Sequence, residues 1–296
     1  MEHSKPVVSV IIRNRNEGVF LEQVLLALSV QTGARLELIL VDNASTDASV
    51  VIALRYGANV IHLKEAEFSY GKALNVGLAA ASGEICIILS AHSLPLGRGF
   101  ASSCVAPFED PEVAAVRCVY AGKWSDMVRW TAPETLKIPA TLDEIVSKGP
   151  LGSGCAIRRD VWAKIPFDER TLSAEDKLWA MSVVKAGYKI ISPCDAFYFY
   201  LKPVSPTAAL RYNYRDLRAL FHATGERLGA AKVGVSDTIL RSIWAILILA
   251  PRSAFVVVHR EWTRMRLRLT FPHKAVRTDT VSVPTSRRVT ESANLS

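Results

Sequence analysis

The chain has 296 residues, of which 50% are hydrophobic and 22% charged, so it can bury the core of one large domain or two unequal ones, and a disordered chain is excluded. Its positive charge is concentrated at one end. Residues 1–200 carry 20 Lys and Arg against 22 Asp and Glu, whereas residues 201–296 carry 16 against 6. Such a basic tail suits an anionic lipid surface, a nucleic acid or simply solvent, and composition leaves these alternatives open.

The cysteines and the N-terminus indicate the compartment. The chain has five cysteines, an odd number, and no C-x-x-C pair, so we expect neither disulfides nor a structural zinc site. The opening "MEHSKPVVSVII" has no cleavage-like signal, and we therefore expect a cytoplasmic protein.

The first part of the chain alternates between strand and helix patterns. Short β-rich apolar runs predict strands, and apolar residues at helical spacing predict helices. The predicted strands are 7–13, 36–42, 59–63 and 84–90, and the predicted helices are 19–32, 45–57 with Ser45 or Thr46 as N-cap and Gly57 past its end, and 70–83. This alternation predicts an α/β fold with a doubly wound, mostly parallel sheet.

The pattern loosens and then returns. Residues 113–122 predict a strand, and residues 123–150 predict either a variable substrate loop or an ordinary surface connection. Residues 174–187 predict a helix capped by Ser173, anchored by Leu178, Met181 and Val184 and ended by Gly187. A further strand follows at residues 188–192.

The last third is basic and apolar. Residues 237–262 are hydrophobic, but Arg241, Pro251 and Arg252 interrupt them, so an interfacial or re-entrant segment fits better than a membrane span. The alternative is a hydrophobic helix packed on the catalytic domain. We predict a domain at 1–204, a helical basic extension at 205–274 that associates with membranes, and a disordered tail at 275–296.

Polar residues follow three of the predicted strands. Arg13 to Glu17 follow the first strand, Asp42 and Asn43 the second, and Ser90, Ala91 and His92 the fourth. Ligands bind beyond the carboxyl ends of parallel strands, so these residues predict one polar site, although each end alone fits ordinary turn chemistry. No glycine-rich phosphate motif follows the first strand. Asp42 suits a base edge or ribose, and Lys72 with Arg13 or Arg15 suits phosphates.

Four blocks resemble the family 2 glycosyltransferases, enzymes of the GT-A fold that use nucleotide-activated sugars. They are "VSVIIRNRNE", "LELILVDNASTD", "FSYGKALNVGLAAASGEICIILSAHSLP" and "FDERTLSAEDKLWAMSVVKAGYKI", and they cover residues 7 to about 200 in the right order. The resemblance implies that the Arg13–Glu17 loop, including Asn14, and Asp42 bind the nucleotide. It also implies that Lys72 and Asn75 lie beside the diphosphate sugar and that Asp176 is the catalytic base.

The chain departs from the family where a strand ends in Ser90, Ala91 and His92. Family members usually have an acidic triplet there that holds Mg²⁺ or Mn²⁺, so the resemblance implies a divalent metal but not its usual ligands. His92 is then a lone metal ligand, a proton donor to the departing phosphate, a neutral hydrogen-bond partner or a structural histidine.

Glu175 and Asp176 begin a predicted helix, where carboxylates also stabilise the helix dipole. Within the family block we interpret this pair as catalytic. The sequence therefore predicts an inverting glycosyltransferase that moves a sugar from a nucleotide sugar to a lipid-linked or envelope-polysaccharide acceptor at the inner membrane face, without a nucleic-acid partner. A catalytically degenerate nucleotide-sugar-binding protein and a nucleotidyltransferase are the alternatives.

Overall fold

A computed structural model describes residues 7–121, 136–138, 151–171, 173–192, 195–202, 215–216 and 219–220, all within one compact unit, Met1–Ala231. Apart from residues 136–138, 215–216 and 219–220, the predicted loop 123–150, the extension 205–274 and the tail 275–296 lie outside the described residues.

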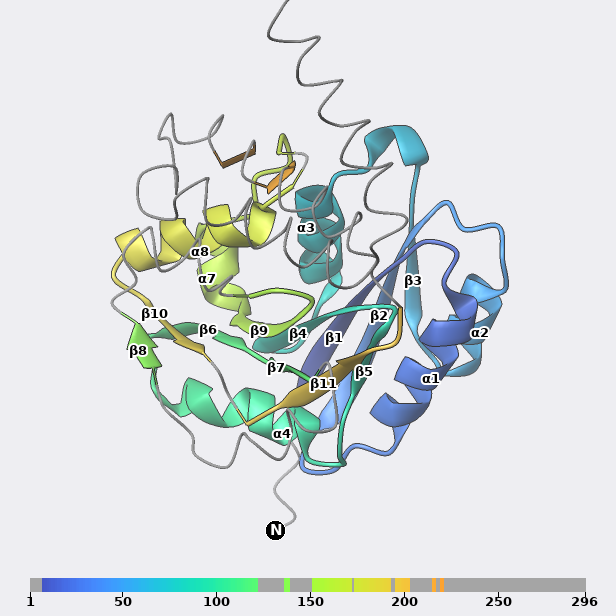
Figure 1. Ribbon diagram of the computed structural model, residues 1–296, viewed down its shortest axis with the longest axis horizontal. Coiled ribbons are helices and arrows are strands. Elements are labelled where there is room, and N and C mark those ends of the chain that lie inside the picture. Colours follow the sequence, from blue (N-terminus) through green and yellow to red (C-terminus); the bar gives the residue numbers. More distant parts are fainter. Residues whose placement is uncertain are drawn as a thin grey trace, which may run out of the picture. The chain divides into compact units, whose positions relative to one another are not determined.

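An eight-stranded sheet forms the centre of the fold (Figure 1). Its order is β3-β2-β1-β4-β9-β6-β10-β8, and neighbouring strands are parallel from β3 to β4 and between β6 and β10. The mostly parallel α/β sheet is therefore confirmed, with β9 running antiparallel to both of its neighbours. The strands are β1 (Val7–Asn14), β2 (Arg35–Asn43), β3 (Asn59–Leu63), β4 (Ile85–Ser90), β6 (Val113–Arg117), β8 (Leu136–Ile138), β9 (Gly154–Arg158) and β10 (Lys189–Ser192).

Helices cover both faces of this sheet (Figure 1). On one face lie α1 (Gly18–Ser29), α2 (Ser49–Arg55) and α4 (Phe100–Val105), and on the other α3 (Tyr70–Ala80), α7 (Arg159–Lys164) and α8 (Glu175–Lys185). Successive side chains of a strand point to opposite faces, so Val10 and Ile12 enter one core and Ile11 enters the other. Continuous apolar runs such as β4 are required because both faces are buried.

A small second sheet joins segments that are far apart in sequence. It has the order β5 (Ser93–Pro95), β11 (Phe197–Tyr200), β7 (Val119–Ala121). The predicted strand 113–122 is wrong as a single element, because it is split at Cys118 between the two sheets. Because β11 pairs with β5, this small sheet brings residue 202 beside the end of β4.

The predicted helix starts need correction. Helix α2 begins at Ser49 after Ala48 and α8 at Glu175 after Ala174, and neither N-cap residue makes a side-chain capping bond. Ser45 instead accepts from the Asn16 N–H at 2.8 Å, and Ser173 donates to Asp216. Ser45 and Ser173, which local sequence predicts as helix caps, thus form hydrogen bonds with distant residues instead.

The helix ends and the inner face of α8 agree better with the predictions. Gly57 and Gly187 have φ values of +72° and +92°, as expected for glycines just past a helix end. Met181 is buried, while Leu178 and Val184 pack against the same core with partial exposure.

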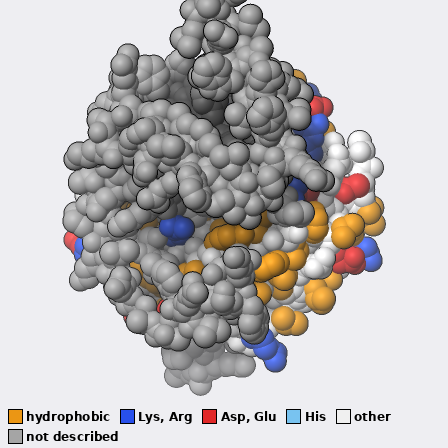
Figure 2. Space-filling view, in the orientation of Figure 1, with side chains coloured by type: hydrophobic (Ala, Val, Ile, Leu, Met, Phe, Trp, Pro, Cys, Tyr) orange, Lys and Arg blue, Asp and Glu red, His pale blue; other side chains and the backbone are white. Residues whose placement is uncertain are grey.

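The outer faces of α1 and α2 carry exposed hydrophobic side chains (Figure 2). Val19 is 76% exposed and Val51 62%. Among the described helices, none is both long and apolar enough to cross a bilayer.

Candidate active site

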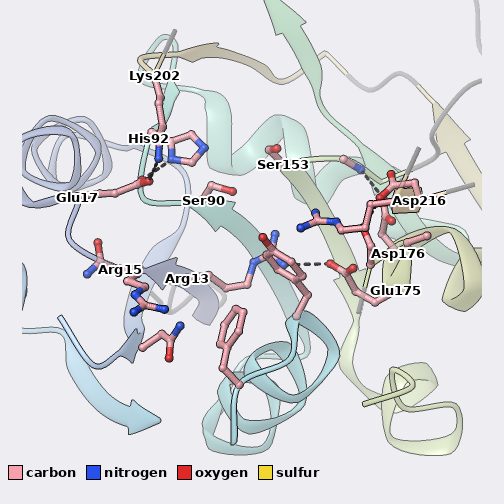
Figure 3. A pocket seen from close by; sticks show the side chains of 18 of the residues that line it. Arg13, Arg15, Glu17, Ser90, His92, Ser153, Glu175, Asp176, Lys202 and Asp216 are labelled. Carbon is pink, nitrogen blue, oxygen red and sulfur yellow. Dashed lines mark hydrogen bonds and ion pairs between the residues drawn. The ribbon is translucent and has the colours of Figure 1, made fainter. Parts of the chain in front are cut away.

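A pocket of about 660 Å³ lies at the carboxyl ends of β1 and β4 (Figure 3). Lys202, His92 and Glu17 lie together on one side of it, Glu175, Asp176 and Asp216 lie on the other, and Ser90 lies between (Figure 3). The residues that line it are Arg13, Asn14, Arg15, Glu17, Asn43, Phe68, Tyr70, Ser90, His92, Gly152, Ser153, Ser173, Ala174, Glu175, Asp176, Tyr200, Lys202, Arg215 and Asp216.

Glu17 joins two cationic or imidazole groups on one side of the pocket. Its Oε1 accepts from Lys202 Nζ at 2.7 Å, and its Oε2 contacts His92 Nδ1. Burial by itself would raise the pKa of Glu17, but the hydrogen bonds and charges of His92 and Lys202 outweigh it and lower that pKa below 4.5. The buried His92 Nε2 has no hydrogen-bond partner within the described part of the chain.

Glu175 and Asp176 lie on the opposite side but differ in environment. Arg13 Nη1 donates to Glu175 Oε1 at 3.0 Å, and the two side chains are only 16% and 9% exposed. Burial raises the pKa of Glu175, the Arg13 charge opposes this shift, and the neighbouring Asp176 adds to it. Asp176 is partly exposed, and its Oδ2 accepts from the Gly152 N–H at 3.3 Å. Of the two carboxylates, Asp176 is the one open to a ligand.

One aromatic ring contacts two guanidinium groups in the pocket. The Arg13 and Arg215 guanidinium carbons lie 5.1 Å and 5.3 Å from the centroid of the Tyr70 ring. Such cation–π contacts hold arginines in place without neutralising their charge. Tyr70 therefore helps to fix the positive groups across the middle of the pocket.

Asp42 lies behind the pocket rather than in its lining. Its Oδ1 accepts from Asn14 Nδ2 at 2.9 Å and its Oδ2 from the Ser45 N–H at 3.0 Å, and its side chain is 2% exposed. Asn14 and Asn43 do line the pocket. Asp42 thus holds the two strand ends together from beneath.

Three non-glycine residues with positive φ flank these site residues: Asn16 at 52°, Ala44 at 51° and Ala174 at 62°. A backbone of this kind costs about 1–3 kcal/mol per residue and persists where the surrounding structure enforces it. All three lie beside pocket residues, namely Glu17, Asn43 and Glu175. The strain is therefore concentrated where the strand ends present their side chains.

Besides Asp42, two more predicted site residues do not line this pocket. Lys72 does not line it, and its N–H donates to the capping Ser69 Oγ at 3.1 Å. Asn75 lines a separate hollow, where its Nδ2 donates to the Phe167 carbonyl at 2.9 Å and its Oδ1 accepts from Trp162 Nε1 at 2.9 Å. The Asn75 amide therefore braces α3 against the segment before α8.

Several pocket residues were missed by the sequence analysis. Tyr70 lies in the third family block, where it was given no role, and Lys202, Arg215 and Asp216 belong to segments with no recognisable local motif. Asp216 accepts from Lys177 Nζ at 2.9 Å and also from Ser173. Arg215 and Asp216 follow "YFYLKP" in a segment that was predicted to be a basic extension, whereas Lys202 lies at the end of the predicted domain 1–204.

The architecture is that of the GT-A glycosyltransferases. A mannosyltransferase from Pyrobaculum calidifontis, solved in complex with GDP-Man and Mn²⁺, superposes with a TM-score of 0.61 at 23% identity, covering 90% of this chain and 86% of that one. The family model for glycosyl transferase family 2 matches residues 9–165, and the chain belongs to this family of enzymes.

Two curated relatives are similar over most of the chain. An O-antigen chain rhamnosyltransferase of Salmonella typhimurium is 24% identical over 73% of this chain and 72% of its own length. A second, from Salmonella anatum, is 27% identical over 67% of this chain and 66% of its own length. The predicted family, fold class and enzyme class are thus confirmed.

Proposed function

We propose that this enzyme is an inverting transferase that moves a sugar from a nucleotide-sugar donor onto an envelope-polysaccharide or lipid-linked acceptor. The observation that carries the proposal is the division of one pocket into a basic side at Lys202 and His92 and an open carboxylate at Asp176 (Figure 3). Glycosyl transfer from a nucleoside diphosphate needs both, because negative charge develops on the leaving group while a proton leaves the acceptor.

On the basic side, Lys202, His92 and Arg15 are placed to meet the diphosphate. Hydrogen bonds to a developing phosphate charge are strongest when the donors are held in position before the reaction. Glu17 holds two of these groups, Lys202 and His92. Asn14, Asn43 and Ser90 are the last residues of β1, β2 and β4 and line the same pocket, where a nucleoside would bind.

On the acidic side, Asp176 takes the proton from the acceptor hydroxyl. Glu175 is unsuited to that role because Arg13 pairs with it in a buried site. We assign Glu175 to positioning Arg13 and α8. Direct attack by the acceptor hydroxyl displaces the nucleoside diphosphate from the opposite face of the anomeric carbon, so the product has the inverted configuration.

Solved enzymes of similar fold contain Mn²⁺ or Mg²⁺, which is consistent with the divalent metal implied by the sequence resemblance. In this pocket the ligand-type side chains that meet are His92 and Glu17, and both oxygens of Glu17 already contact other groups. No set of three or more His, Cys, Asp or Glu side chains in the described ranges is arranged to hold a metal. These residues do not fit the usual carboxylate-rich site, so no step above is routed through a metal.

The acceptor class is supported by the relatives, two of which are O-antigen chain rhamnosyltransferases. The basic charge of residues 201–296 supports attachment to the inner face of the membrane through anionic lipids. The donor is a nucleotide sugar, as in the mannosyltransferase complex with GDP-Man.

The test uses the full-length protein and a panel of nucleotide sugars, first for thermal stabilisation and then for release of the nucleoside diphosphate. Asp176→Asn should keep donor binding and lower transfer by roughly 10²–10⁴-fold, the usual effect of a positioned general base. Asp160→Asn is the matched control, since Asp160 is an exposed carboxylate on α7. Near-normal turnover of the Asp176 variant would overturn the assignment of Asp176 as the base.

Two other results would contradict the proposal more broadly. Binding of a nucleotide sugar without hydrolysis or transfer would identify a degenerate binding protein. Release of pyrophosphate from a nucleoside triphosphate and a sugar phosphate would identify a nucleotidyltransferase.

A further inference from the structure

We propose that Lys202, held in place by Glu17, supplies the positive charge that binds the donor diphosphate, so that this enzyme binds nucleoside diphosphates without a divalent metal. The inference rests on the proposed function, because it assumes that a nucleoside diphosphate occupies this pocket.

Strand pairing brings Lys202 to the site from a distant part of the chain. β11 runs antiparallel to β5 with Tyr200 opposite Ser93, and the Leu201 N–H donates to the His92 carbonyl at 2.9 Å. The Tyr200 ring packs edge-on against the His92 ring with centroids 4.3 Å apart. The backbone at residues 200–202 is therefore fixed against the turn that follows β4.

Glu17 fixes the position of the Lys202 ammonium. The carboxylate is 12% exposed, whereas the Lys202 side chain is 50% exposed and lines the pocket. Its lowered pKa keeps Glu17 anionic at neutral pH. An ammonium group carries three N–H donors, so its bond to Glu17 is compatible with donation to a phosphate oxygen.

His92 completes this group. Its Nδ1 faces Glu17, and its Nε2 is the buried ring nitrogen with no partner in the described structure. In the imidazolium form both ring nitrogens donate. A phosphate oxygen in the pocket would give Nε2 the acceptor that it lacks.

The same arrangement disfavours a divalent cation. A metal at Glu17 would lie within a few ångströms of the Lys202 ammonium, where like charges repel, and it would compete with the bonds that Glu17 already makes. In this proposal, the Lys202 ammonium provides the positive charge that a metal ion provides in a carboxylate site.

The experiment measures binding of UDP, GDP and dTDP, and of the matching nucleosides, by calorimetry in excess EDTA and in Mn²⁺. The full-length protein should bind one of the diphosphates in EDTA with an affinity close to that in Mn²⁺. Lys202→Met should lower the affinity for that diphosphate by about 10- to 100-fold, as expected for loss of a charge-assisted hydrogen bond. The same variant should bind the matching nucleoside with unchanged affinity. Lys202→Arg should retain most of the affinity for the diphosphate.

Lys189→Met is the matched control. Lys189 is 44% exposed and pairs with Asp110 at 3.2 Å on another part of the surface, so its removal should change neither affinity. The inference is overturned if EDTA abolishes diphosphate binding and Mn²⁺ restores it, or if Lys202→Met binds like Lys189→Met. If none of the diphosphates binds in either condition, the proposed function fails and this inference fails with it.

Discussion

The Arg13 guanidinium donates to the Glu175 carboxylate at 3.0 Å, and this buried pair ties the end of β1 to the first turn of α8, 162 residues further along the chain. The pair fixes one wall of the pocket and leaves Asp176 as the accessible carboxylate. Loss of the Arg13–Glu175 pair should therefore lower the stability of the fold and change the shape of the pocket.

Arg13→Met should lower the free energy of unfolding by about 3–5 kcal/mol, because it leaves Glu175 buried without its cation. Chemical denaturation measures this loss. Arg55→Met is the control, since Arg55 and Glu22 are exposed and 3.8 Å apart, and should cost at most about 1 kcal/mol. Adding Glu175→Gln to Arg13→Met should restore part of the stability. Equal losses for the two arginines would contradict the structural role.

Asp42→Ala should lower stability and nucleotide affinity together. The change removes one of the two acceptors of Asn14 Nδ2 and the acceptor of the Ser45 N–H, which costs about 1–3 kcal/mol and weakens the hold on Asn14 at the pocket. Denaturation and nucleotide titration on the same preparation measure both effects. Lower affinity with unchanged stability would instead support the direct base or ribose contact that the sequence predicts.

Asn75→Ala should lower stability by about 1–3 kcal/mol without changing donor affinity, because its amide bonds the Phe167 backbone and Trp162 rather than lining the main pocket. Thermal unfolding and donor titration separate the two quantities. A selective loss of donor affinity in a stable variant would restore Asn75 to the donor site.

His92→Gln should lower transfer by roughly 10²–10³-fold, the range found for loss of one preorganised donor, while stability changes much less. Glutamine keeps a hydrogen-bonding group next to Glu17 but cannot carry the positive charge. Steady-state kinetics and thermal unfolding give the comparison. If chelated wild-type enzyme is inactive and Mn²⁺ restores it better than Mg²⁺, His92 acts instead as a metal ligand.

Glu17→Gln should alter the pH dependence of stability. The folded-state pKa of Glu17 lies below 4.5, because His92 and Lys202 outweigh the effect of burial. The unfolded chain therefore binds more protons between the two pKa values, and the stability from Glu17 is complete above about pH 4.5 and lost as pH falls through the folded pKa.

The difference in unfolding free energy between wild type and Glu17→Gln should accordingly be largest near neutral pH and shrink on acidification. Denaturant titrations across the acid range measure it. Glu22→Gln, which alters an exposed pair, should show little difference at any pH. A Glu17 difference that does not change with pH would rule out this linkage.

The alternating elements and three of the strand ends could be predicted from the sequence because their signals are local. The apolar runs of β1, β2 and β4 need burial on both faces, and parallel strands bring their carboxyl ends to one edge. Arg13, Asn14, Glu17, Ser90 and His92 were accordingly predicted near one another, as were Glu175 and Asp176, and the structure places all seven around one pocket.

The rest depended on contacts between distant segments. Lys202 reaches the site because β11 pairs with β5, and Asp216 because Ser173 and Lys177 bind it. Ser173 predicts a helix cap locally, but it donates to Asp216 instead, and Asp42 accepts a hydrogen bond from Asn14 behind the pocket. The sequence by itself determined the α/β order and the chemistry at the strand ends, since both follow from burial and periodicity. Only the tertiary structure decided which polar groups face the pocket and which brace it, because a hydrogen bond depends on a partner's position that no local pattern encodes.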